Sequence, residues 1–276
     1  DGSESCLNCD YFEDEPDEKK TWHRCGKPDY GSCICTGDPH CWQFDMAKVA
    51  EPNMLIMGSC MFDMIRDDCG SNQQKSFRVT ANFQRAKPHM TRSYVKELFV
   101  TFFSRLTPIE LKFMHGPGEP SVVVENFRTE YKQHITEFPY TDDVNAPGVE
   151  IKLNSSAVTG DLWYKSKSSV VLIATLPNNM VVYWDGDKTV EMALPRHFMG
   201  RTCGICGDFN GQVDNDRTMG SHTTFADRGC TPLEARGQPG DQASNDQDFA
   251  NSWFARKDHG DDYCKEECEM DELLGR

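Results

Sequence analysis

The stretch Cys203-Gly-Ile-Cys-Gly-Asp-Phe-Asn-Gly-Gln-Val-Asp-Asn-Asp216 contains two cysteines three positions apart, followed by a loop rich in oxygen-bearing side chains. These side chains are Asp208, Asn210, Asp214, Asn215 and Asp216. Carboxylate and amide oxygens are ligands for hard cations, so the loop could wrap Ca²⁺. It is not an EF-hand, because counting from Asp208 puts glycine fourth and Met219 twelfth, where that motif needs glycine sixth and glutamate twelfth. A solvated Asn/Asp/Gly loop is the alternative interpretation.

The composition indicates an extracellular protein. Thirteen cysteines in 276 residues are typical of disulfides formed in an oxidising compartment, and Asn154-Ser-Ser156 is an N-glycosylation sequon. The odd cysteine count predicts a thiol that is free or links two chains in a disulfide-bonded dimer. The net charge of −15 argues against nucleic acid as a partner. No apolar run approaches the roughly 18 residues of a membrane span, so none is expected.

Hydrophobic patterning predicts an antiparallel all-β fold, either a sandwich or barrel-like. Apolar residues alternate with polar ones from Phe77 to Phe83, which is the period of a half-buried strand. The Asp185-Gly186 pair between two apolar runs predicts a β-hairpin. A short helix is expected near residues 249–256. The runs predicted as strands are 54–65, 77–84, 94–103, 109–113, 121–124, 149–153, 169–176, 180–184 and 188–194.

Four motifs together resemble the hallmarks of the von Willebrand factor type D domain. Cys203–Gly211 is similar to C-G-L-C-G-N-F-N-G, and Cys35-Thr-Gly-Asp-Pro-His-Cys-Trp-Gln-Phe-Asp45 to C-x-x-G-D-P-H-Y-x-T-F-D-G. Gly58-Ser-Cys-Met-Phe62 matches G-x-C-x-Y, and Phe249-Ala-Asn-Ser-Trp253 matches F-G-N-S-W. The resemblance implies a type D domain over 35–265. The composition indicates an acidic, cysteine-containing extension over 1–34, which the resemblance does not cover, and an acidic tail over 266–276.

The resemblance also implies a structural calcium site. Asp208 stands where the family usually has Asn, and Asn215 stands where it usually has Asp, so the formal charge of the ligands is kept. The implied ligands are Asp45, Asp208, Asn210, Asn215, Asp216 and a main-chain carbonyl near Val213.

Three disulfides follow from position in the family pattern: Cys35–Cys206, Cys69–Cys203 and Cys60–Cys264. The spacing of Cys203 and Cys206 also suits thiol–disulfide exchange, although structural pairing is favoured by flanks that look like a strand end and a metal loop. A zinc site that uses His23 with nearby cysteines is a further alternative. The pairing of the other cysteines stays open: Cys6, Cys9, Cys25, Cys33, Cys41, Cys230 and Cys268.

The segment Asp38-Pro39-His40 has its own chemistry. An Asp–Pro bond is acid-labile because the carboxyl group can attack its own carbonyl carbon, and some family members cleave this motif autocatalytically. The alternative is a plain turn, in which proline fixes φ before the next strand.

We therefore expect a secreted, calcium-binding, disulfide-rich structural or interaction module. Its partner would be an extracellular protein, a glycan or a small hydrophobic ligand, and a monomer or disulfide-linked dimer is favoured over a head-to-tail polymer. The alternative is a cofactor-free oxidase that resembles secreted luciferases acting on a small imidazopyrazinone. No nucleophile elbow, zinc-protease motif or nucleotide fingerprint supports catalysis, so no catalytic residue is assigned.

Overall fold

The computed structural model describes residues 30–37, 40–45, 54–56, 60–69, 75–87, 93–104, 107–115, 120–155, 170–220 and 240–255. Within them the chain forms two antiparallel sheets, so the predicted all-β fold is confirmed. The eight-stranded sheet has the order β10 (Tyr140–Asp142), β11 (Ala146–Ser155), β12 (Val170–Thr175), β13 (Val181–Trp184), β14 (Val190–Pro195), β1 (Tyr30–Thr36), β2 (His40–Trp42) and β3 (Met54–Leu55).

The six-stranded sheet follows the order of the chain. Its strands are β4 (Met61–Arg66), β5 (Phe77–Arg85), β6 (Ser93–Ser104), β7 (Thr107–Met114), β8 (Ser121–Asn126) and β9 (Tyr131–Ile135). Two short 3₁₀ helices, η3 (Arg196–Phe198) and η4 (Val213–Asn215), and the helix α2 (Asp246–Ser252) lie in the C-terminal part. The predicted helix is confirmed, but it begins at Asp246, where the side chain of Asn245 caps it by accepting from the Asp248 amide.

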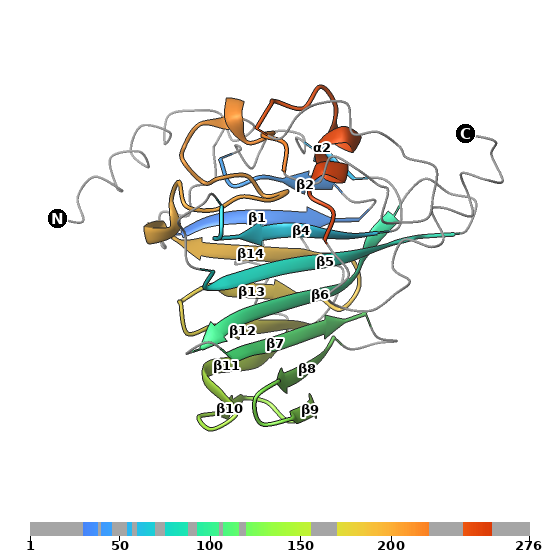
Figure 1. Cartoon of the computed structure of the whole chain (residues 1–276). Helices are drawn as coiled ribbons and strands as arrows, with labels where there is room; N and C mark the ends of the chain where they lie inside the picture. Colours follow the sequence, from blue (N-terminus) through green and yellow to red (C-terminus); the bar gives the residue numbers. More distant parts are fainter. Residues whose placement is uncertain are drawn as a thin grey trace, which may run out of the picture.

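The core lies between the two sheets, which are stacked as shown in Figure 1. The alternating residues of β5 point into it, and Phe77 and Phe83 are at most 1% exposed. Burying each such ring contributes about 1.5–3 kcal/mol relative to exposure. Trp184, at the end of β13, crosses the core and donates from Nε1 to the Met114 carbonyl on β7 at 3.1 Å.

The predicted hairpin at Asp185-Gly186 joins β13 to β14. The Asp185 carboxylate oxygen Oδ1 accepts from the amides of Asp187, Lys188 and Thr189 at 2.8–2.9 Å. Gly186 has φ +76°, and a Cβ there would lie 2.7 Å from Pro120. The turn therefore needs glycine both for its backbone conformation and for the close approach of residue 120.

Three strands were not predicted. Most of β1 was assigned to the acidic N-terminal extension, but it is a largely buried strand that pairs with β14 on one side and β2 on the other. The predicted boundary at residue 34 falls inside this strand. β9 and β10 lie at the outer ends of the two sheets, where exposed polar side chains interrupt the apolar pattern.

The motif-bearing loops gather at one end of the stack. In Figure 1, the segment after β14 and helix α2 lie above β1, β2 and β4, whereas β9 and β10 lie at the opposite end. Because β4 is the edge strand of its sheet, its outer backbone groups are available to the C-terminal segments. Bridges join Phe62 to Phe254 and Arg66 to Cys203.

Candidate metal centre and its disulfide frame

The segment Cys203–Cys206 connects the two sheets at this end. The Ile205 amide donates to the Asp63 carbonyl at 3.0 Å, and the Cys206 amide donates to the Met64 carbonyl at 2.9 Å, both on β4. On its other side, the Cys206 carbonyl accepts from the amide of Phe44, just after β2, at 3.0 Å. We call this segment the seam, because it fills the space between the two sheet edges.

The glycines of the motif are required by close approaches. Gly204 has φ +122°, and a Cβ there would lie 2.5 Å from the Met64 carbonyl oxygen. Gly207 has φ +84°, and its Cβ would lie 2.1 Å from the Asp216 carboxylate. A side chain at either position would displace the seam or the acidic loop.

The disulfides correct one predicted pairing. Cys206 is bonded to Cys33, and Cys35 is bonded to Cys41, so the predicted Cys35–Cys206 bond is wrong. Cys33 and Cys35 are two positions apart on β1, so their side chains share a face, and both are fully buried. Cys35 lies directly opposite Cys41 in the β1–β2 pair, with the Cα atoms 4.2 Å apart, which leaves Cys33 for Cys206.

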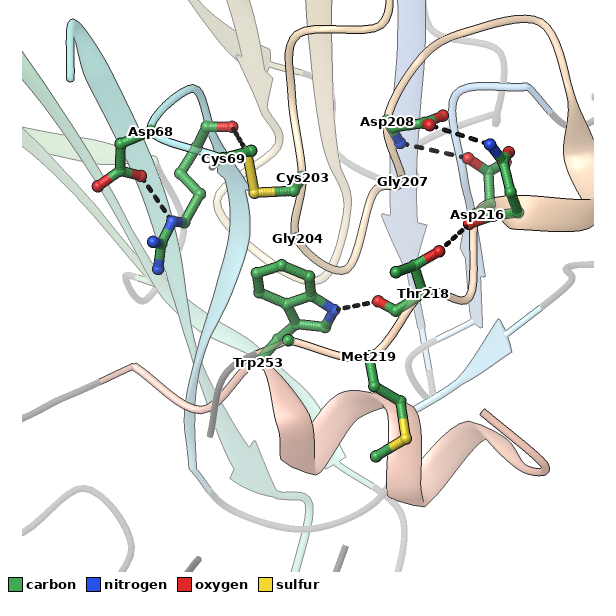
Figure 2. Close-up of a pocket in the computed structure, with 13 residues that line it drawn as sticks. Asp68, Cys69, Cys203, Gly204, Gly207, Asp208, Asp216, Thr218, Met219 and Trp253 are labelled. Atoms are coloured by element: carbon green, nitrogen blue, oxygen red, sulfur yellow. Dashed lines mark hydrogen bonds and ion pairs between the residues drawn. A yellow bond between two sulfur atoms is a disulfide. The ribbon is translucent and has the colours of Figure 1, made fainter. Parts of the chain in front are cut away.

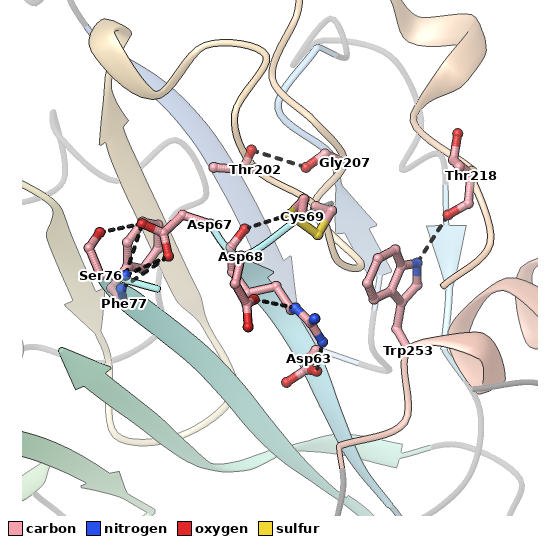
Figure 3. The surroundings of a disulfide bond; sticks show 12 residues. Asp63, Asp67, Asp68, Cys69, Ser76, Phe77, Thr202, Gly207, Thr218 and Trp253 are labelled. Carbon is pink, nitrogen blue, oxygen red and sulfur yellow. Dashed lines mark hydrogen bonds and ion pairs between the residues drawn. A yellow bond between two sulfur atoms is a disulfide. The ribbon is translucent and has the colours of Figure 1, made fainter. Parts of the chain in front are cut away.

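The predicted Cys69–Cys203 disulfide is confirmed, and Figure 3 shows its surroundings. It ties the segment after β4 to the first residue of the seam. Beside it, the Asp67 carboxylate accepts from the amides of Ser76 and Phe77, which holds the start of β5 next to the end of β4. Cys60 is also disulfide-bonded. Its predicted partner, Cys264, lies outside the described residues, so that pairing stays a prediction.

Three of the predicted metal ligands converge. Asp45, Asp208 and Asp216 each place one carboxylate oxygen so that the three atoms lie within 4.8 Å of one another. Asp45 comes from the end of β2, and the other two come from the loop after the seam. Asp216 is only 2% exposed. These three carboxylates could together hold a metal ion.

Hydrogen bonds within the loop hold the carboxylates in place. The Asn210 amide donates to Asp45 Oδ2 at 2.9 Å, and the Asp208 amide donates to Asp216 Oδ1 at 3.3 Å. The side-chain amides of Asn210 and Asn215 donate to Asp208 Oδ2 at 2.7 and 3.1 Å. Phe209, which has φ +53°, packs its ring against Phe44 with centroids 5.2 Å apart and so anchors the loop.

The electrostatics of the site fit a cation. Among the described residues, Asp208 Oδ1 and Asn215 Oδ1 are buried and have no hydrogen-bond donor. Burial raises the pKa of the Asp208 carboxyl, and the nearby negative charge of Asp45 raises it further. Buried oxygen atoms that lack donors, in a set consisting only of oxygen ligands, suit a hard cation.

The remaining predicted ligands take other roles in the hydrogen-bond network. Asn210 Oδ1 accepts from the Gln212 amide at 2.7 Å. The Val213 carbonyl opens η4 and accepts from the Asp216 amide at 3.4 Å. Coordination through Asn210 or Val213 therefore stays a prediction.

A pocket of about 280 Å³ lies beneath the acidic loop. Figure 2 shows the indole of Trp253 in its wall, donating to the Thr218 carbonyl, with Asp208 and Asp216 on the other side. The disulfide Cys69–Cys203 forms a further part of the wall. The pocket therefore borders both the metal centre and the start of the seam.

Gln43 was missed by sequence reasoning. Its side chain is fully buried, and Nε2 donates to the carbonyls of Ile205 at 2.8 Å and Asp216 at 2.9 Å. The only signal in the sequence is a polar residue between Trp42 and Phe44, in a segment otherwise apolar up to Asp45.

The other predicted sites are only partly described. Asp38 and Pro39 lie outside the described residues, while His40 is exposed at the start of β2. Asn154 is half-buried on β11, where Val149 and Ile151 point to the core, so it lies on the opposite face. Cleavage at Asp38–Pro39 and glycosylation at Asn154 stay predictions. Among the described helices, none has the length and apolar character needed to cross a membrane.

Fold and site together define a β-sandwich closed at one end by a disulfide-bonded segment and an acidic loop. Residues 33–223 match the model of the von Willebrand factor type D domain, which is more than half of the chain. The chain therefore belongs to this family, as its motifs predicted.

Several curated relatives support the same assignment. The chain is 25% identical to human mucin-5AC over 213 residues, 24% identical to human zonadhesin over 201 residues, and 37% identical to SCO-spondin of Rattus norvegicus over 200 residues. These alignments cover 76%, 70% and 72% of this chain, respectively. They cover only 3%, 6% and 3% of the relatives, so the chain spans a small part of their length.

Proposed function

We propose that this chain is an extracellular structural or adhesive module whose acidic loop is locked by Ca²⁺. The observation that carries the proposal is the convergence of the Asp45, Asp208 and Asp216 carboxylates beside buried oxygens that lack donors. Three carboxylates this close repel one another, and a divalent cation offsets that repulsion.

The chemistry of the donors favours Ca²⁺ over softer metals. Every available ligand is an oxygen, whereas zinc and copper prefer nitrogen or sulfur. Cys203 and Cys206, which precede the acidic loop in the sequence, are both in disulfides, which do not ligate as thiolates do. Asp45, Asp208 and Asp216 would hold the ion. Asn215 is a further candidate ligand, because its side-chain oxygen is buried without a hydrogen-bond donor. When bound, the ion would supply positive charge that holds the loop to the end of β2.

The extracellular assignment rests on the disulfides and on the family. The described part of the chain contains three disulfides between identified cysteines, which persist in oxidising compartments. The relatives include mucins and zonadhesin, whose names indicate mucus and adhesion. We propose an extracellular protein or glycan as the partner, with a small hydrophobic ligand as a further candidate class.

Calcium binding is tested by thermal unfolding in EDTA and in Ca²⁺. At calcium a hundredfold above the dissociation constant, binding to the native state adds about 2.7 kcal/mol to the free energy of unfolding. For a chain of this size we expect a rise in Tm of roughly 5–10 °C. Asp216→Asn should abolish the rise, because it removes a buried ligand charge.

Asp214→Asn is the matched control, because Asp214 lies in the same loop but is exposed and outside the triad. It should keep the full calcium-dependent rise. An EDTA-insensitive Tm, in protein shown by metal analysis to hold no trapped ion, would contradict the calcium assignment.

The oxidase alternative makes a different prediction, namely a large apolar cavity within the β core. In the described residues, large side chains such as Trp184, Phe62 and Phe113 fill the core and are fully buried or nearly so. The pocket of about 280 Å³ described above lies beside the acidic loop and includes carboxylates in its wall, which do not suit a small apolar substrate. These features favour the structural module.

A further inference from the structure

We propose that Gln43 is a positioning residue that couples the metal centre to the seam between the two sheets. This inference rests on the proposed calcium binding. It adds that the bound ion would strengthen the contact between the two sheets at this end of the sandwich.

The first observation is the contact of Gln43 with the seam. Its Nε2 donates to the Ile205 carbonyl at 2.8 Å. The amide of the same residue donates to the Asp63 carbonyl on β4 at 3.0 Å. Ile205 is therefore held from the eight-stranded sheet through Gln43 and from the six-stranded sheet through Asp63.

The second observation is the contact of Gln43 with the metal centre. The same Nε2 donates to the main-chain carbonyl of Asp216 at 2.9 Å. This bond fixes the backbone that carries the most buried carboxylate of the triad. Gln43 also lies only two residues before Asp45, so one short segment after β2 delivers both a ligand and the group that positions another ligand.

The chemistry needs a primary amide at this position. One nitrogen must donate two hydrogen bonds to two carbonyl oxygens, and a primary amide has two N–H groups. The type D motif carries Thr here, and a hydroxyl has a single hydrogen to donate. Gln43 can therefore hydrogen-bond to both carbonyls at once, whereas the threonine of the family motif can donate to only one of them.

The consequence is reciprocal coupling. If Ca²⁺ orders Asp216, the Asp216 carbonyl stays in reach of Gln43, and Gln43 in turn stays in place to hold Ile205. Removing the ion should loosen the seam as well as the loop, and removing the amide should weaken ion binding by the same linkage.

The experiment uses the full chain and the variant Gln43→Met, which is similar in volume and has no donor. We expect calcium affinity, measured by isothermal titration, to fall about tenfold, because two buried carbonyls lose their donor. In calcium-saturated protein, hydrogen exchange at the Ile205 and Cys206 amides should speed up to the rate that the wild type shows in EDTA.

Asn126→Leu is the matched control. Asn126 is 6% exposed, and its side-chain amide donates to the Asn145 carbonyl at 2.7 Å, at the opposite end of the sandwich. This variant should lose stability but keep the wild-type calcium affinity and the wild-type exchange at Ile205. An equal loss of affinity in both variants would reduce Gln43 to a general stability residue and overturn the proposal.

The wild type supplies a test that does not depend on the variant folding. If EDTA speeds exchange in residues 208–216 but leaves the Ile205 and Cys206 amides protected, the loop and the seam are not coupled and the inference is wrong. If the wild type shows no calcium binding by titration, the proposed function itself fails. Normal calcium binding with unchanged affinity in Gln43→Met refutes the inference only.

Discussion

Removing the two disulfides on β1 one at a time should cost very different amounts of stability. Because the Cys69–Cys203 disulfide stays intact in Cys33→Ala with Cys206→Ala, the Cys33–Cys206 bond closes a loop that runs through it, from 33 to 69 and from 203 to 206, of about 40 residues in place of its full sequence separation of 173. The loop-entropy relation assigns a bond across about 40 residues about 4 kcal/mol. Cys35→Ala with Cys41→Ala opens a separation of 6, for which the same relation gives about 2 kcal/mol. All four cysteines are at 0% exposure, so the packing losses nearly cancel in the comparison.

We therefore expect the first double variant to be about 2 kcal/mol less stable than the second. The assay is urea unfolding without reductant, with the free energy taken from linear extrapolation. EDTA should be present throughout, because Cys206 adjoins the acidic loop and a change in calcium binding would otherwise enter the result.

The single variant Cys41→Ala tests the pairing directly. It should release the thiol of Cys35, which can be labelled with an alkylating reagent after unfolding and located by mass spectrometry. If Cys206 were bonded to Cys35, this variant would leave that bond intact and the label would appear elsewhere. A label on Cys33 would contradict the Cys35–Cys41 pairing, and equal stabilities for the two double variants would contradict the dependence on loop length.

Two further predictions concern pH. In metal-free protein the pKa of the Asp208 carboxyl is raised above its ordinary value of about 3.8. Between that value and the raised one, the native state binds more protons than the unfolded state. The free energy of unfolding should therefore fall as pH rises through this range. Ca²⁺ requires the ionised carboxylate, so the difference in Tm between calcium and EDTA should shrink on acidification towards pH 4; a constant difference would contradict this. Separately, mild acid should cut the chain at Asp38–Pro39 into fragments that separate only after reduction, because the two disulfides of β1 both span that bond. Fragments that separate without reductant would contradict the disulfide map, and an intact chain after days at pH 5–6 would leave the segment a plain turn.

Much of this fold could be predicted where the signal is local. The alternation from Phe77 to Phe83 depends only on strand geometry, and it identified β5 with its buried face. Asp185-Gly186 identified the β13–β14 hairpin, because few residue pairs can adopt that turn. By contrast, β1 was missed, since the longer of its two pairings is with β14, which is distant in the sequence.

The candidate site likewise has residues that could be predicted from the sequence and a residue that could not. Family motifs brought Asp45, Asp208 and Asp216 together correctly across about 170 residues, because the motif already records a tertiary arrangement. For Gln43 the sequence shows a polar residue between two aromatic ones, but it does not show what that residue contacts. Its two acceptors are main-chain carbonyls, which every residue has, so no pattern of side chains could identify them.

Hydrophobic alternation and turn residues were enough to predict an antiparallel β protein with an acidic loop next to two cysteines, and the resemblance to the type D domain supplied the Cys69–Cys203 pairing. The cysteine of β1 that bonds to Cys206 depends on how the strands pair in the folded chain. Cys33 and Cys35 project from the same face of one strand, so sequence spacing cannot separate them. The register of β1 against β2 sets Cys35 opposite Cys41, and that pairing assigns Cys33 to the seam.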